Sequence, residues 1–85
     1  MNERRIASPE RLDQEGGRAV LDALQSEPLE AGQSVILDLS GTRHMDSKGG
    51  AWLMRLAELV RAKQGGLHWE GQQGQVAEFI DLIEP

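Results

Sequence analysis

The chain has 85 residues, no cysteine and a formal net charge of −5, so we expect one small domain over residues 1–85 with neither disulfides nor thiolate metal sites. The acidic balance and the lack of a basic stripe argue against binding to nucleic acid. No apolar run is long enough for a signal peptide or for membrane insertion, which favours a cytoplasmic protein that reaches the inner face of a membrane only through a partner.

The N-terminal part of the chain shows one short strand pattern and one helix pattern. Residues 4–7 fit a strand, which Pro9 and the charged residues after it end. A helix is expected over about 13–25, with Asp13 as its N-cap. The stretch 26–33, which contains proline and glycine, is typical of a loop.

The middle of the chain carries the strongest strand pattern, SVILDL at residues 34–39, which is almost wholly apolar. Such a strand is typical of the centre of a sheet or of burial on both faces. After the loop SGTRHM, a helix is expected over about 47–63, ended by Gly65 and Gly66. Its core-facing stripe, at the helical period, consists of Gly49, Leu53, Leu56, Ala57 and Val60.

The C-terminal part adds a strand over 67–70, whose Trp69 we expect in the core, and a helix over about 75–83. The elements alternate in the order (β)-α-β-α-β-α, with a parallel strand–helix–strand crossover over 34–70. This order predicts an α/β fold in which helices pack against a small mixed sheet. We find no internal repeat in the sequence.

The stretch HMDSKGG, residues 44–50, places an acid, a hydroxyl, a cation and two glycines at a predicted strand-to-helix turn. A nucleotide-binding P-loop needs a glycine-rich run ending in Gly-Lys-Ser/Thr, and a hydrolase nucleophile elbow needs Gly-x-Ser-x-Gly; this stretch has neither order. The histidines, His44 and His68, lack metal-ligand spacing. A small hydrolase or nucleotide-binding domain is therefore kept only as the alternative of another class, and we expect no catalytic residue, metal or cofactor.

The same stretch suits the start of a helix. Asp46 or Ser47 can cap the free amides of the first turn. Gly49 and Gly50 allow the helix to lie close to the sheet or to a partner. Capping by itself does not explain why a helix should begin with two glycines, which are unfavourable in helices.

The segment SVILDLSGTRHMDSKGGAWLMRL, residues 34–56, resembles the signature of STAS domains: an apolar strand ending in Asp-Leu-Ser, a short loop, and Asp-Ser-x-Gly opening a helix. The resemblance covers roughly residues 11–83. It implies a STAS-like fold with reduced N-terminal strands, since the family usually opens with two strands and only residues 4–7 are available here. An unpaired sheet edge would allow the chain to form a homodimer.

The resemblance also implies a function, because STAS domains are non-catalytic interaction modules. In the anti-sigma factor antagonists, a partner kinase phosphorylates a hydroxyl residue that usually directly precedes the motif glycine. Lys48 holds that position here. The leading expectation is therefore the branch of bacterial STAS proteins that regulate ABC-type lipid transporters through the permease or ATPase. The alternative is an anti-sigma factor antagonist that is phosphorylated at Ser47 and binds an anti-sigma factor kinase.

The expected partner-binding surface is the Asp-Ser-x-Gly loop with the following helix. On a helical wheel, Trp52 and Leu59 lie beside the core stripe, about 80–140° from its centre at roughly 100° per residue. Trp52 is then either an interface anchor or a cover for the edge of the core. The predicted partner-binding residues are Asp46, Ser47, Lys48, Gly49, Gly50, Trp52 and Leu59.

Overall fold

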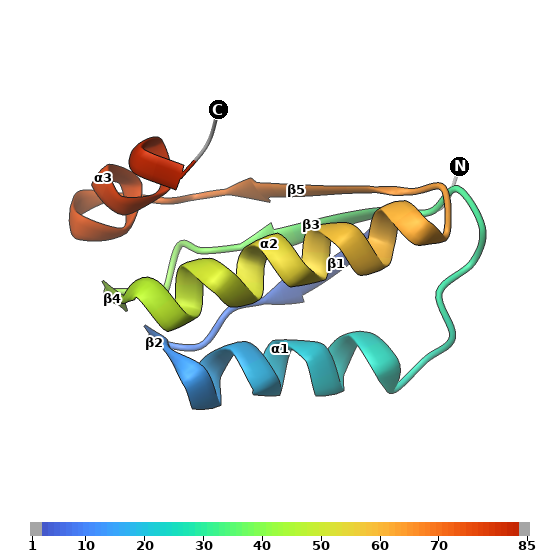
Figure 1. The fold of residues 1–85 in the computed structure, drawn as a ribbon, viewed down its shortest axis with the longest axis horizontal. Coiled ribbons are helices and arrows are strands. Elements are labelled where there is room, and N and C mark those ends of the chain that lie inside the picture. The colour runs from blue at the N-terminus through green and yellow to red at the C-terminus, as the bar shows by residue number, and fades with distance from the viewer. Residues whose placement is uncertain (1–2, 84–85) are drawn as a thin grey trace.

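The computed structural model describes residues 3–83, except for the side chain of Ile83, and these residues form five strands and three helices (Figure 1). The alternating order expected from the sequence is confirmed, and so is the small α/β class. Neither β2 nor β4 is predicted from the sequence, because a two-residue strand carries no periodic pattern. In chain order the elements are β1 (Glu3–Ala7), β2 (Arg11–Leu12), α1 (Gln14–Gln25), β3 (Ser34–Asp38), β4 (His44–Met45), α2 (Ser47–Ala62), β5 (Gly66–Glu70) and α3 (Gly74–Ile83).

The three longer strands form one sheet in the order β1-β3-β5, and β2 pairs separately with β4. Every strand pair among the described residues is parallel, whereas the sequence predicts a mixed sheet. The difference arises because no second N-terminal strand forms an antiparallel hairpin with β1 within residues 3–83. β1 and β5 are the outer strands, and pairing with a second copy through such an edge stays a prediction.

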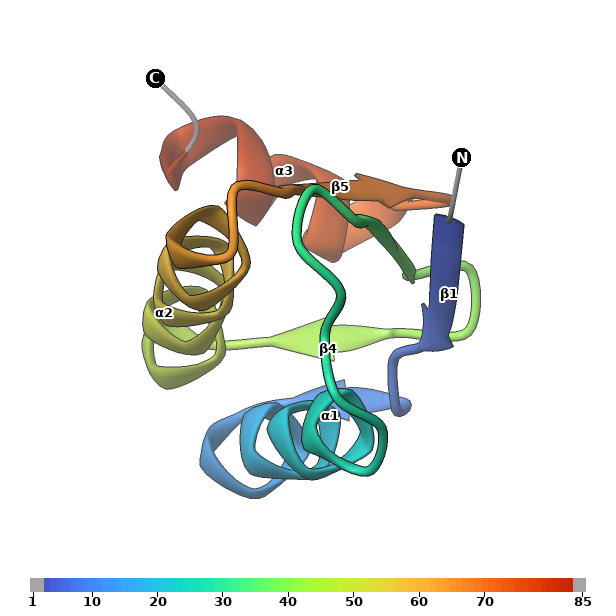
Figure 2. The same cartoon turned by 90° about the vertical axis from the view of Figure 1, so that its right-hand side faces the viewer.

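Helices α1 and α2 lie on one side of the β1-β3-β5 sheet (Figure 2). β3 therefore occupies the expected centre of a sheet but is not buried on both faces: Val35 and Leu37 are buried, whereas Ile36 between them is half-buried. The second face is polar, and an ion pair joins Arg5 to Glu70 across it. The hydrogen bond from Arg5 to Glu70 and the negative charge of Glu70 raise the pKa of Arg5.

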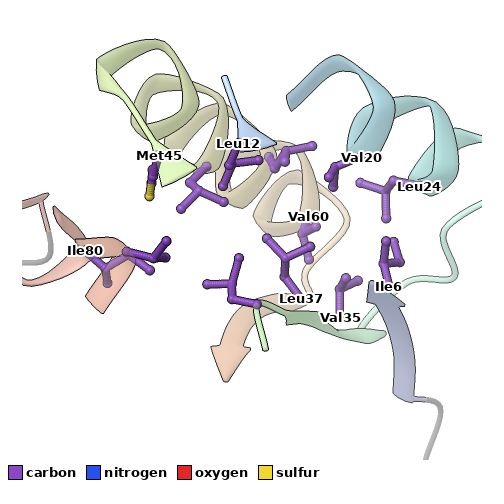
Figure 3. Close-up of a cluster of buried hydrophobic side chains, with 13 residues drawn as sticks. Ile6, Leu12, Val20, Leu24, Val35, Leu37, Met45, Val60 and Ile80 are labelled. Carbon is purple, nitrogen blue, oxygen red and sulfur yellow. The ribbon is translucent and has the colours of Figure 1, made fainter. Parts of the chain in front are cut away.

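The core lies between the sheet and the two long helices, and it extends to α3 (Figure 3). The stripe predicted on α2 is buried except for Ala57, which is half-buried. Trp69 is half-buried and packs against the core, as expected. The buried hydrophobic residues are Ile6, Leu12, Val20, Leu24, Val35, Leu37, Leu39, Met45, Leu53, Leu56, Val60, Val76 and Ile80.

The C-terminal end of α2 differs in detail from the expected glycine cap. The left-handed residue after the helix is Gln64, with a φ of 64°, and neither Gly65 nor Gly66 has a positive φ. Gly65 is needed for space, because a Cβ at this position would lie 2.1 Å from the carbonyl oxygen of Gln33. Glycine thus allows close packing here and does not serve to reverse the backbone.

Arg4 joins β1 to the C-terminal end of α1. Its guanidinium donates hydrogen bonds to the carbonyl oxygens of Ala23 at 2.5 Å, Leu24 at 2.9 Å and Glu27 at 3.0 Å. The last carbonyls of a helix have no partner within the helix, and α1 has no basic residue in its last turn. Arg4 therefore supplies, from a strand, the donors and the positive charge that this helix end lacks.

Replacing Arg4 by methionine should lower the free energy of unfolding by about 1–3 kcal/mol, because charge-assisted hydrogen bonds to helix-end carbonyls are lost. Urea denaturation of the purified domain measures this change. Arg5→Met is the matched control, since the neighbouring Arg5 lies on the open face in an exposed ion pair and should matter much less. An equal loss of stability in both variants would contradict the capping role of Arg4.

Candidate functional site

The HMDSKGG stretch forms the turn from β4 into α2, and we call residues 44–50 the second corner. Asp46 is the N-cap of α2: its Oδ1 accepts a hydrogen bond of 2.9 Å from the amide of Gly49. Its carbonyl oxygen accepts another, also of 2.9 Å, from the amide of Gly50. Of the two expected capping residues, Asp46 therefore holds the helix start, and Ser47 is the first residue of the helix.

The same arrangement occurs at the start of α1, in residues 11–17, which we call the first corner. Asp13 is the N-cap, as predicted, and its Oδ1 accepts a hydrogen bond of 2.9 Å from the amide of Gly16. RLDQEGG and HMDSKGG share the spacing Asp-x-x-Gly-Gly. The expectation of no internal repeat is therefore wrong for this short motif. The shared Asp-x-x-Gly-Gly spacing is the signal in the sequence that could have revealed the repeat.

The two corners lie side by side. β2 leads into the first corner and β4 into the second, and the strands pair in parallel with Leu12 opposite Met45. The amide of Asp46 donates a hydrogen bond of 3.4 Å to the carbonyl oxygen of Leu12. As a result, the N-terminal ends of α1 and α2 lie at the same end of the molecule (Figure 1).

Glycines allow close backbone packing both between the corners, at Gly49, and within the first corner, at Gly16. A Cβ on Gly49 would lie 1.8 Å from the carbonyl oxygen of Leu12, and a Cβ on Gly16 would lie 2.0 Å from that of Arg11. Gly49 and Gly50 are both buried, so they are not part of the surface open to a partner. The close approach that Gly49 permits is within the chain, which explains a glycine at this position despite its low helix propensity.

Trp52 of α2 packs over the first corner. A Cβ on Gly17 would lie 2.2 Å from Cγ of the indole, and the indole N–H donates a hydrogen bond of 3.2 Å to Oε1 of Gln14. The guanidinium of Arg55 lies 5.6 Å from the centroid of the Trp52 ring, within the range of a cation–π contact. Trp52 is half-buried, so one part of its side chain covers the edge of the core and the other part is exposed at the molecular surface. Gln14 belongs to α1, so a helical wheel drawn for α2 alone cannot predict its contact with Trp52.

The remaining predicted partner-binding residues lie on the molecular surface. Asp46, Ser47 and Lys48 are exposed, and Leu59 is 40% exposed. Lys48, Trp52 and Leu59 line hollows in the groove between α1 and α2, which we call the α1–α2 seam. The hollow nearer the corners has a volume of about 200 Å³, and the one nearer the C-terminal ends of the helices has a volume of about 280 Å³.

The side chain of Gln75, which the sequence does not single out, links α3 to the second corner. Its Oε1 accepts a hydrogen bond of 3.0 Å from the amide of Met45, and its Nε2 donates one of 2.8 Å to the carbonyl oxygen of the same residue. The amide side chain thus pairs with β4 as a neighbouring strand would. This contact fixes the strand that leads into the motif.

Residues 3–83 show neither a hydrogen-bonded serine–histidine pair nor a cluster of metal ligands. Ser47 makes no side-chain hydrogen bond among these residues, and His44 and His68 are both exposed. No cluster of ligating side chains suited to a metal ion occurs in this part of the chain. The corners form a close-packed pair of helix starts, and the exposed α1–α2 seam lies beside them.

Gly49→Ala should lower the free energy of unfolding by about 3 kcal/mol, because the new methyl group overlaps a backbone carbonyl of β2. Without that overlap, alanine would stabilise the helix by about 1 kcal/mol. Gly41→Ala is the control, because a Cβ there meets no atom within 4 Å. Denaturant titration compares the two, and equal stability would show that the corners are not close-packed.

Comparison with known proteins agrees with this fold. A family model described as "Mlab, STAS domain" matches residues 3–84. Searches of curated proteins and of solved structures found no match. None of the described helices combines the length and the apolar character needed to cross a membrane. STAS domains act through contacts with other proteins and are generally not enzymes. Because the family model covers nearly the whole chain, this protein belongs to the STAS domain family.

Proposed function

We propose that this STAS domain regulates or stabilises an ABC-type lipid-transport complex on the cytoplasmic side of a membrane. It contacts the permease or the ATPase through the second corner and the exposed side of α2. The surface available for this contact comprises Ser47, Lys48, Trp52 and Leu59, while Gly49 holds the helix in place from inside. The domain itself needs no catalytic group for this role.

The observation that carries this proposal is the position of Lys48. It is the second residue of α2, directly before the glycine that contacts β2, and its side chain is exposed. The anti-sigma factor antagonists usually carry their phosphorylated hydroxyl at this place in the motif. A lysine cannot accept a phosphate in the same way, so the position favours a permanent docking surface. The half-buried Trp52 beside it supplies an aromatic contact of the kind that dominates protein interfaces.

The exposure of Ser47 supports a second candidate function, that of an anti-sigma factor antagonist. Ser47 is the first residue of α2, and its hydroxyl makes no hydrogen bond within the described residues. A phosphate at a helix N-terminus lies near free amides and the positive end of the helix dipole. Phosphorylation there would add negative charge directly beside Lys48.

Affinity purification of the tagged protein from its own cells tests the proposal. The expected result is co-purification with a membrane permease and its ATPase, reduced at least roughly tenfold by Trp52→Ala because interface aromatics contribute strongly to affinity. Ser47→Glu should also weaken binding, because it places a negative charge on the surface. Met54→Ala is the control, since Met54 is exposed on the same helix and lines neither hollow of the seam.

Other results would decide against the transporter role. If a kinase partner with ATP phosphorylates Ser47, and Ser47→Ala remains bound to its partner, the phosphorylation switch is correct. Turnover of a substrate that Ser47→Ala abolishes would exclude both interaction roles.

A further inference from the structure

The charge along the α1–α2 seam is opposite in sign to that of the whole chain. The formal net charge of the protein is −5. In contrast, α2 and its C-cap residue contribute three cations to the two hollows of the seam, namely Lys48, Arg55 and Lys63. Glu58 is the only acidic residue of α2, and it lines neither hollow. The one acid in their lining is Glu27, which lies on the loop after α1.

Apolar side chains alternate with these cations along the seam. Trp52 lies between Lys48 and Arg55 in sequence, and Leu59 lies between Arg55 and Lys63. The cations are thus seven and eight residues apart, and the two apolar residues are seven apart. A repeat of about seven residues places side chains in one line on a helix, which is the spacing that a neighbouring helix contacts. Leu21 and Leu24 of α1 complete the apolar floor of the larger hollow.

From this alternation we infer that the α1–α2 seam binds an amphipathic helix of a partner protein that carries acidic residues about two turns apart. Apolar residues of that helix occupy the two hollows, against Trp52 and against Leu59. Its carboxylates pair with Lys48, Arg55 and Lys63. The distance from Lys48 to Lys63 along α2 is about 22 Å, so roughly four turns of a partner helix span the seam.

The shape and charge of the seam favour a helix over other partners. Both hollows lie between α1 and α2, which run in roughly the same direction (Figure 1), so they accept a ridge of side chains, as in helix-in-groove recognition. A membrane would need protruding apolar residues, yet Trp52 is half-buried and Leu59 is only 40% exposed. A second copy packed symmetrically on the seam would bring the same three cations together, which like-charge repulsion opposes.

Site-specific photo-crosslinking in the cells that make the protein tests this inference. A benzophenone amino acid replaces Leu59 in the seam in one variant of the full chain, and Met54 in the matched control. The two residues are similarly exposed, at 40% and 46%, and only Leu59 lines the seam. Mass spectrometry then identifies the crosslinked peptide. The expected product from position 59 is a peptide with acidic residues seven or eight positions apart and apolar residues between them, and position 54 should not give this product.

A charge reversal tests the ionic part separately. Arg55→Glu, combined with the crosslinker at position 59, should reduce the yield of this product about tenfold, because like charges then face each other. Arg61→Glu makes the same change of charge on the same helix, outside both hollows, and should leave the yield unchanged. Circular dichroism confirms that both variants are folded.

This inference rests on the proposed docking role of α2, but it can fail independently. A transporter subunit that co-purifies yet crosslinks through position 54 alone would overturn the inference and keep the proposed function. An acidic amphipathic peptide from a protein other than a transporter would support the inference and overturn the proposed function. A phospholipid, a basic peptide or a second copy of the chain at position 59 would overturn the inference.

Discussion

The contact between the first turn of α2 and β2 is the constraint on which the rest of this structure depends. Between Gly49 and the carbonyl oxygen of Leu12 there is no room for a side chain, since a Cβ would lie 1.8 Å from that oxygen. This closeness lets β2 pair with β4 and sets the two helix starts side by side. It also brings Trp52 over Gly17, so that the seam between α1 and α2 begins at the corners. Substitution of either glycine would separate elements that define both the core and the exposed surface.

The family motif therefore divides into residues with different tasks. Asp46 caps α2 and Gly49 allows it to pack, so these two residues maintain the fold. Ser47 and Lys48, between them, have exposed side chains and are free to contact a partner. A similar division applies to the first corner, where Asp13 and Gly16 hold α1 and the intervening Gln14 bonds to Trp52. In both corners, the outer motif positions thus hold the backbone, while side chains at the middle positions make other contacts or face the surface.

The residues that stabilise the domain and the residues proposed to bind a partner lie on different surfaces. On the inner side, the core and the Arg4 contacts with α1 tie the sheet to the helices. The outer face of the sheet carries an exposed ion pair, and such pairs contribute little to stability. The seam lies on neither of these surfaces. Its three cations and Leu59 are exposed and lie outside the core, so they are available to another protein.

Much of the fold follows from the sequence by itself. The apolar run at 34–39, the helical stripe on α2 and the alternating order determine the α/β class, the central strand and the buried side of the main helix, because periodicity directly reflects which side is buried. The sequence also locates the Asp-Ser-x-Gly motif and shows that Lys48 replaces the hydroxyl residue usual in anti-sigma factor antagonists. Only the tertiary structure decides that β2 and β4 pair, that Gly49 faces Leu12 rather than a partner, and that Gln14 and Gln75 hold the corners. These contacts join residues about 30 or more positions apart, and no local pattern encodes such a distance because only the packing of α1, α2 and α3 brings the residues together.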